Sequence, residues 1–424
     1  TSKRYVVKKN EETYRNVFVT HFPDEERPDA RPAKTSPVYD KLVRMGAVFG
    51  QRYGWERANW FAPPGVPAQD QWSFRRSNYF EHVGNEALRL RRHVGVIDLT
   101  PFTKHEVTGP GAESWLDGLV ANKVPVKVGR IALCHALTRR GGIRSEFTIT
   151  KIADQHYYVV SAGAAERYDS DYLQQSLPPD GGVTLRNITM SRGCFVVAGP
   201  RSRDVLAKLV DAPLDNAAFP WLTGQVTEVG LATDVYLLRV NFVGALGWEL
   251  HFPIEYAHHL FDSLFAAGAE FNIGMAGMRA MESLRMEKSY RMWGSDLTPD
   301  YSPYEAGLDR FVRLNKGPFI GKEALEKQLE RGVPHRFVTF EVHGVTDADP
   351  LGNEPLFDRK GNIIGRATAG YYGHALGKSL GLGYVKPEFA EVGGGIEIEI
   401  LGERKHATVL VDSPYDPENR DLRA

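Results

Sequence analysis

Residues 244–250 read Gly-Ala-Leu-Gly-Trp-Glu-Leu and indicate a buried strand that carries a single carboxylate. The two glycines have no side chain, so another backbone or a ligand can approach this strand closely. Glu249 stands between Trp248 and Leu250, and a carboxylate among apolar side chains is costly to bury unless donor groups pair with it. The partner of Glu249 therefore decides whether this strand binds a ligand or only takes part in an internal ion pair.

Two kinds of partner fit Glu249. A pterin or guanine-like ring offers two parallel N–H donors and would bind the carboxylate bidentately. A guanidinium would do the same, and Arg279 and Arg285 lie on the next predicted helix. From residue type alone, the ion pair with an arginine is the preferred interpretation.

Strand-like and helix-like patterns alternate on both sides of this stretch. Strands are predicted over residues 104–108, 131–137, 147–152, 157–161, 194–198, 235–241 and 249–252. Helices are predicted over residues 79–93, 256–267, 275–288 and 319–331, with others near Pro110, Ala164 and Pro200. Asn78 and Glu81 form a capping box before the first of these helices. The pattern predicts an α+β fold rather than a doubly wound parallel sheet.

The two ends of the chain differ from this central region. Gly332 and Pro334 mark a boundary, and the short strands predicted after it suggest a small β-barrel. Residues 23–37 are rich in Pro and charge and predict an extended arm. Residues 53–64 are aromatic and irregular, which predicts an ordered loop packed on the core.

Composition excludes several classes of protein. The chain has 424 residues, which at roughly 150 residues per domain predicts two or three domains. Its net charge of -1 gives no global attraction to nucleic acid or to an acidic membrane. The two cysteines, Cys134 and Cys194, exclude a disulfide framework and suit the cytosol or an organelle matrix. With 42% hydrophobic residues and no long apolar run, no membrane segment is expected.

Several familiar motifs are also missing. The sequence has no G-x-G-x-x-G opening a βαβ unit, no P-loop and no nucleophile elbow. The 13 histidines show no metal-ligand spacing, so we expect no metal site.

Residues 141–148, Gly-Gly-Ile-Arg-Ser-Glu-Phe-Thr, predict a hairpin with Glu146 on its second strand. Glu146 could act as a general base. An ordinary exposed strand glutamate is the alternative, and residue type alone favours it.

The helix at residues 279–287 carries charges among apolar residues that cover more than one face. These charges must pair inside the protein or face a site. Trp293 follows, and a Trp or Met here is more often part of a core than of a cofactor site.

These motifs, in this order, resemble the folate-binding C-terminal half of dimethylglycine and sarcosine dehydrogenases, and more distantly the aminomethyltransferase of the glycine cleavage system. The similarity covers nearly the whole chain. It is carried by residues 53–57, 98–104, 141–143, 244–250, 279–287, 302–308, 370–379 and 415–419.

The resemblance implies ferredoxin-like α+β subdomains around a central folate cavity, plus a small C-terminal β-barrel. Glu249 matches the family's pterin-binding carboxylate, which reverses the preference for an ion pair. Glu146 falls where the family usually has an Asp proposed to assist one-carbon transfer, which makes it the candidate catalytic residue. The other implied folate-binding residues are Phe242, Arg279, Arg285, Trp293 and Tyr371.

Phe242 and Ala245 also depart from the family pattern, because they replace a common Tyr and a common acidic residue. The implied domains are an arm and linker contacting a flavin domain or subunit (residues 1–75), a folate-binding aminomethyltransferase-like domain (76–332) and a barrel (333–424). In this family FAD belongs to a domain N-terminal to the folate module. The expected cofactors are therefore tetrahydrofolate here and FAD in a partner domain or subunit.

The implied function is that of a one-carbon transfer subunit in a flavin-linked N-demethylase, which captures methylene or formaldehyde to form 5,10-methylenetetrahydrofolate. One alternative is a stand-alone tetrahydrofolate-dependent O- or S-methyltransferase, although residues 55–57 resemble the flavin-linked branch. A non-catalytic folate-binding or scaffolding subunit is the other alternative, which the changes at Phe242 and Glu146 permit.

Overall fold

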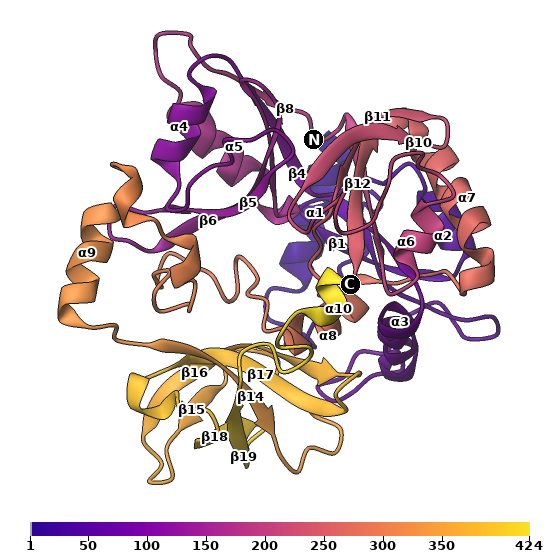
Figure 1. Ribbon diagram of the computed structural model, residues 1–424. Helices are drawn as coiled ribbons and strands as arrows, with labels where there is room; N and C mark the ends of the chain where they lie inside the picture. Colours follow the sequence, from indigo (N-terminus) through magenta and orange to yellow (C-terminus); the bar gives the residue numbers. More distant parts are fainter. Residues whose placement is uncertain (1) are drawn as a thin grey trace.

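The computed structural model describes residues 2–424, in which two sheets and a closed barrel surround the middle of the molecule (Figure 1). The six-stranded sheet has the order β10 (Gly224–Val229), β11 (Ala232–Leu238), β12 (Gly247–Pro253), β9 (Arg192–Ala198), β3 (Gly95–Asp98) and β13 (Gly274–Met275). The five-stranded sheet has the order β5 (Ile131–Leu137), β6 (Ile143–Ala153), β7 (His156–Ser161), β4 (Thr103–Thr108) and β8 (Thr184–Asn187). Neighbouring strands are antiparallel except β13 and β3, so the α+β prediction is confirmed.

The predicted C-terminal barrel is confirmed and has six strands. Their order around the barrel is β14 (Arg336–Val342), β17 (Lys378–Val385), β16 (Ile363–Gly373), β15 (Pro355–Phe357), β18 (Gly395–Ile400) and β19 (Glu403–Leu410). Strand β15 was not predicted, because it is only three residues long and pairs with two neighbours.

Helices pack on both faces of the six-stranded sheet and on the outer face of the five-stranded sheet (Figure 1). They are α2 (Tyr39–Arg44), α3 (Phe80–Arg92), α4 (Ala112–Leu119), α5 (Glu166–Gln175), α6 (Ser202–Leu206), α7 (Ala257–Gly268) and α8 (Met278–Glu287), with α9 (Lys322–Arg331) before the barrel and α10 (Arg420–Arg423) near the C-terminus. Among residues 2–424, none of the helices has the length and hydropathy needed to cross a bilayer.

Two local predictions were wrong. Residues 53–64 do not form an irregular loop, because β2 (Trp55–Phe61) pairs antiparallel with β1 (Ala47–Arg52) and buries Trp60 completely. The capping box of the next helix does not form either. The Asn78 side chain instead accepts a hydrogen bond from the Gln71 amide at 3.0 Å and donates to the Gln69 carbonyl at 2.9 Å, so the preceding loop uses its polar atoms.

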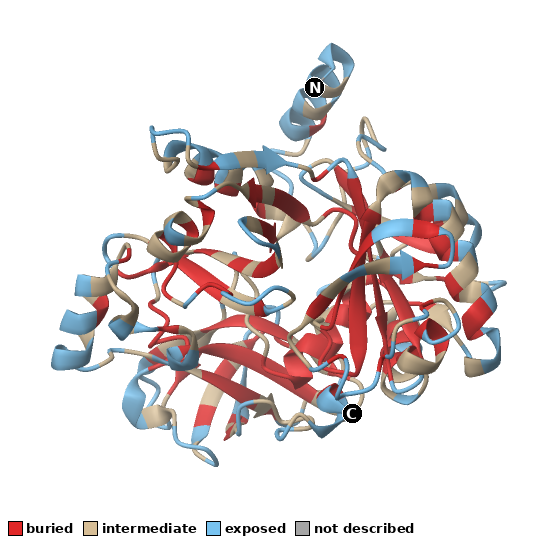
Figure 2. Cartoon of the chain, turned by 45° about the horizontal axis from the view of Figure 1, so that its top comes forward, coloured by how far each residue is buried: buried red, intermediate tan, exposed pale blue. Residues whose placement is uncertain are grey.

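The N-terminal arm consists of α1 (Lys3–Arg15) and an extended segment that leads back to the body. Helix α1, which the sequence analysis missed, stands clear of the body in Figure 2 and is largely exposed. Beyond it, Arg31 donates to the Glu56 carboxylate, with Nε 3.0 Å from Oε1. The predicted extended segment is therefore attached to β2 through a partly buried ion pair.

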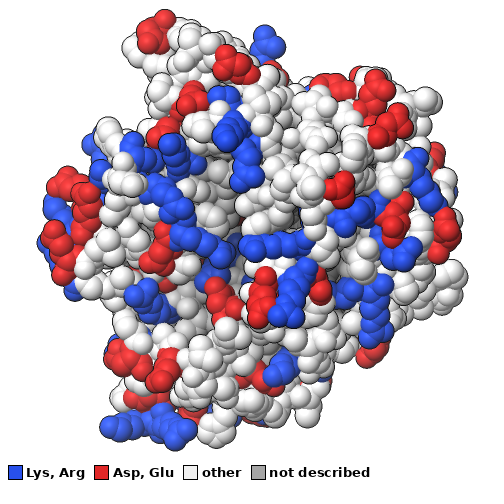
Figure 3. All heavy atoms as spheres, viewed as in Figure 1, with Lys and Arg blue, Asp and Glu red and all other residues white. Residues whose placement is uncertain are grey.

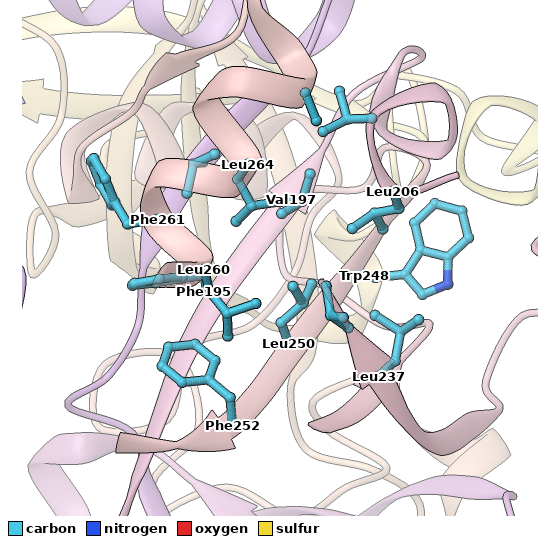
Figure 4. Close-up of a cluster of buried hydrophobic side chains, with 14 of the residues drawn as sticks. Phe195, Val197, Leu206, Leu237, Trp248, Leu250, Phe252, Leu260, Phe261 and Leu264 are labelled. Carbon is cyan, nitrogen blue, oxygen red and sulfur yellow. The ribbon is translucent and has the colours of Figure 1, made fainter. Parts of the chain in front are cut away.

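Strand alternation decides which side chains face the middle of the molecule. On β12, Trp248, Leu250 and Phe252 point toward α6 and α7 and form the outer core of the six-stranded sheet (Figure 4). Side chains alternate between the faces of a strand. Glu249 and His251 therefore face away from this core, toward the five-stranded sheet.

The five-stranded sheet is arranged in the same way. Phe147 and Ile149 of β6 pack with Leu116 and Leu119 of α4 on the outer face. Glu146, which alternates with them, belongs to the inner face.

Candidate functional site

The inner faces of the two sheets touch through a small hydrophobic cluster. Tyr158 and Val160 of β7 contact Tyr236 and Leu238 of β11 there. Leu238 is the cross-strand neighbour of Glu249, and Val160 is the neighbour of Thr148, two residues after Glu146. The fold thus brings the two predicted carboxylates to facing surfaces, although they lie 103 residues apart in the chain (249 minus 146).

Glu249 is 6% exposed and is paired with a histidine rather than an arginine. The Nε2 atom of His251 lies 3.0 Å from Glu249 Oε2, and the Nδ1 atom lies 2.9 Å from the Tyr158 hydroxyl. Burial lowers the pKa of His251 below its ordinary value, although Glu249 opposes this shift. Among residues 2–424, no hydrogen bond is found to Glu249 Oε1, so one carboxylate oxygen stays available to a ligand.

Cys194, Glu249 and His251 are also the one set of potential metal ligands within residues 2–424, with donor atoms within 4.8 Å of one another. A metal requires the thiolate form of cysteine. Burial raises the pKa of the Cys194 thiol well above its ordinary value, and the carboxylate and imidazole already satisfy each other. The set therefore favours a hydrogen-bonded network over a metal centre.

Lys104 adds a positive charge close to this network. Its ammonium donates to the Thr100 carbonyl at 2.7 Å and to the Phe102 carbonyl at 2.9 Å. Burial lowers the Lys104 pKa to about 8. Since its side chain is fully buried and held by backbone oxygens, we assign it a structural role.

Glu146 also has a histidine partner that the sequence analysis missed. His135 on β5 is the cross-strand neighbour of Glu146, and its Nε2 atom lies 3.0 Å from Glu146 Oε2. The Glu146 side chain is 22% exposed, whereas His135 is 1% exposed. His135 thus anchors one carboxylate oxygen while the other can reach a reacting group. The hairpin predicted at residues 141–142 indicated that these two strands pair, but a register shift between Ala136 and Leu137 sets His135 opposite Glu146.

Trp293 lies beside the strand that carries Glu146. Its indole Nε1–H donates to the Arg144 carbonyl at 2.9 Å, two residues before Glu146. Its ring centroid is 5.8 Å from that of Tyr168 on α5. The indole therefore holds the start of β6 in place, and its predicted contact with folate stays a prediction.

Substitution Trp293→Phe separates these two roles. Loss of the indole hydrogen bond should lower the free energy of unfolding by about 1 kcal/mol. Denaturant unfolding measures this term, and folate titration of the same variant reports any ligand contact. A variant with lower stability but unchanged folate affinity would contradict the binding role.

The two predicted arginines both have protein partners. Arg279 donates to Asp70 at 2.6 Å and its guanidinium lies 3.6 Å above the Tyr79 ring. Arg285 donates to the fully buried Asp296 at 2.6 Å. Neither arginine pairs with Glu249, so the ion-pair interpretation of that residue was wrong, and their own contact with folate stays a prediction.

Phe242 and Tyr371 are brought to the face that carries Glu249. Both are half-buried and pack on the hydrophobic cluster that includes Val196, the other cross-strand neighbour of Glu249. The Phe242 ring lies 5.7 Å from the Tyr290 ring. Their arrangement gives this face the apolar surface on which a planar ring can pack.

Basic side chains gather on the central face of the molecule. Figure 3 shows Lys and Arg around the hollowed middle of the face seen in Figure 1. The chain has a net charge of only -1, so this concentration is local. A hollow with a basic rim favours an anionic ligand.

Comparison with known protein families accounts for most of the chain. Residues 38–316 match the GCVT N-terminal domain, and residues 335–416 match the glycine cleavage T-protein C-terminal barrel domain. Residues 1–36 match the FAD dependent oxidoreductase central domain.

Two curated relatives align over nearly all of the chain. Mouse mitochondrial dimethylglycine dehydrogenase is 36% identical over 412 residues, which are 97% of this chain and 47% of the relative. The 4-methylaminobutanoate oxidase (formaldehyde-forming) of Paenarthrobacter nicotinovorans is 31% identical, covering 100% of this chain and 51% of the relative. The chain thus spans about half the length of these relatives.

A solved structure shares the fold. The glycine cleavage system aminomethyltransferase T from Bartonella henselae superposes with a TM-score of 0.79 and 24% identity, covering 91% of this chain and 99% of that one. At this identity the match supports the fold alone.

Proposed function

Because the chain belongs to the glycine cleavage T-protein family and is homologous to the C-terminal half of dimethylglycine and sarcosine dehydrogenases, we propose that it transfers one-carbon units to tetrahydrofolate. The electrophile is a methylene iminium ion or formaldehyde, released when an FAD-containing partner oxidises an N-methyl amino acid. The product is 5,10-methylenetetrahydrofolate. The observation that carries this proposal is the pair of carboxylates, Glu249 and Glu146, on facing inner surfaces.

In this function Glu249 binds and orients the pterin. Its two oxygens accept from the parallel N–H donors of the ring, because Oε1 is free and Oε2 keeps a second lone pair beside its contact with His251. This charge-assisted bidentate interaction fixes the ring plane. The half-buried rings of Phe242 and Tyr371 supply apolar surface nearby, and the basic rim suits the carboxylates of the folate tail.

Glu146 is proposed as the proton acceptor. When one folate nitrogen attacks the electrophilic carbon, a C–N bond forms as the C=N or C=O π bond breaks, and this nitrogen must lose a proton. The Glu146 carboxylate takes this proton, and His135 keeps it oriented. The amine, or water in the case of formaldehyde, then leaves as the second folate nitrogen bonds to the same carbon. Holding folate and the electrophile together supplies most of the remaining rate enhancement.

One comparison supports a second candidate function. The relative from Paenarthrobacter nicotinovorans is named for releasing formaldehyde. Phe242, which lacks the hydroxyl common at this position, is compatible with a subunit that binds folate or supports a flavin partner without catalysis. The two functions differ in whether saturating folate suppresses free formaldehyde.

The N-terminal arm is the proposed contact with the flavin partner. Residues 1–36 match the central domain of an oxidoreductase that depends on FAD. After α1, the arm exposes Val17, Phe18 and Val19, whose exposed fractions are 58%, 97% and 51%. Three consecutive exposed apolar residues are costly in water and suit a protein interface.

Substitution Phe18→Ser tests this contact in the chain expressed with the flavin-containing part of the enzyme. An exposed aromatic that becomes buried in an interface contributes more than about 1 kcal/mol, so flavin retained per chain should fall about fivefold or more. Leu231→Ser, at an exposed apolar residue (78%) on the β10–β11 turn, is the matched control. Equal flavin retention by wild type, Phe18→Ser and Leu231→Ser would contradict the proposed role of the arm.

Titration of the isolated chain tests the proposed function directly. We expect a colourless protein that binds tetrahydrofolate in calorimetry, because the carboxylate site is present and a dinucleotide fingerprint is not. Stoichiometric flavin retained by the isolated chain, or the absence of folate binding, would overturn the assignment.

A further inference from the structure

We propose that His251 and Tyr158 are positioning residues that hold the Glu249 carboxylate in the orientation required for the pterin. This inference rests on the proposed function and extends it to two further residues. His251 contacts Glu249, and Tyr158 contacts His251. It starts from three side chains in a row: Glu249, His251 and Tyr158. Each contact joins atoms at hydrogen-bond distance.

Donor and acceptor chemistry allows one arrangement of this row. An ionised carboxylate only accepts hydrogen bonds, so the proton between Glu249 and His251 must be on Nε2. A neutral imidazole then has a lone pair on Nδ1, and the Tyr158 hydroxyl donates to it. Neutral His251 agrees with its burial, which lowers its pKa. Every polar atom along this row except Glu249 Oε1 thereby has a hydrogen-bond partner.

The neighbouring thiol does not change this assignment. Cys194 Sγ lies 3.7 Å from His251 Nε2, a distance that fits a weak contact with sulfur. A thiol that donated to Nε2 would require a lone pair there, and that lone pair would face the Glu249 carboxylate. Such an arrangement is repulsive, so the sulfur lies beside the Nε2–H group.

The row connects the two sheets and ends in the ligand-binding atom. Tyr158 belongs to β7 of the five-stranded sheet, whereas His251 and Glu249 belong to β12 of the other. His251 is fully buried and Tyr158 is fully buried, so neither side chain is free to rotate. With Oε2 fixed by His251, the plane of the carboxylate is set and Oε1 is directed to the ligand before it binds.

A double-mutant cycle on folate affinity tests the positioning role. His251→Leu should weaken the Kd for tetrahydrofolate by roughly tenfold or more, because hydrogen bonds to charged groups are strong. His251→Gln should largely restore affinity, since its amide N–H can donate to the carboxylate. The affinity of Tyr158→Phe for tetrahydrofolate should lie between those of His251→Leu and His251→Gln. His105→Leu, which removes another buried histidine bonded to Ser170 at 2.9 Å, is the control for a purely structural loss.

Coupling between the sites separates positioning from general destabilisation. If His251 acts through Glu249, the variant with both Glu249→Gln and His251→Leu should bind no more weakly than Glu249→Gln alone. Additive losses, or no rescue by His251→Gln, would overturn the positioning role while leaving folate binding established.

Nitrogen NMR of the ligand-free protein gives a readout that does not depend on folate. The His251 ring, assigned by comparison with His251→Gln, should show a protonated Nε2 and an unprotonated Nδ1. A protonated Nδ1 would overturn this inference alone. If wild type bound no tetrahydrofolate, the proposed function would fail, and the positioning role would fail with it for lack of a ligand.

Discussion

Glu146→Gln is expected to slow methylene transfer to tetrahydrofolate by roughly 10²–10⁴-fold, the range typical for loss of a general base. The amide keeps the size of the side chain and one acceptor oxygen, so folate affinity should stay nearly unchanged. The neutral amide cannot take the proton released by the attacking nitrogen. Binding and chemistry should therefore separate in this variant.

The assay requires the chain together with its flavin partner and an N-methyl amino acid. Free formaldehyde and 5,10-methylenetetrahydrofolate are measured under saturating folate, and formaldehyde should accumulate in the variant. Glu106→Gln is a matched control, because Glu106 lies two strands away in the same sheet and also pairs with a histidine, His156, at 3.0 Å. If wild type itself yielded only formaldehyde, the non-catalytic candidate function would replace the proposed one.

Glu249→Ala is expected to weaken tetrahydrofolate binding by about 2 kcal/mol, or roughly 30-fold in Kd, because a charge-assisted bidentate contact is lost. Calorimetry of the isolated chain measures this change without the flavin partner. Glu106→Ala controls for removal of a carboxylate from a strand in the other sheet. Unchanged affinity would mean that Glu249 serves only as the hydrogen-bond partner of His251.

Local patterns were sufficient for much of the fold. Alternating apolar residues indicated the strands that became β5 and β12, and Gly141 and Gly142 indicated the hairpin between β5 and β6. These features depend on contacts between residues close in the chain, so they are visible in a single stretch of sequence. Residues 55–61 were not predicted as a strand, because they contain several aromatic residues and are followed by Pro63 and Pro64. Their strand conformation depends on pairing with β1.

The carboxylates of the site could be named from the sequence, but their surroundings could not. Arg279 and Arg285 were both possible partners of Glu249, and their actual partners, Asp70 and Asp296, lie in other segments. Which of several charges meets which carboxylate depends on long-range packing. Residue type alone does not encode this choice.

The sequence by itself determined the family, the alternation of helices and strands, and the identity of Glu146 and Glu249 as candidate residues. Only the tertiary structure showed that His135 and His251 hold these carboxylates. A strand register places His135 opposite Glu146, and contact between two sheets places Tyr158 on His251. Register and sheet packing are set by the burial of many side chains at once, so they emerge only when the whole chain has folded.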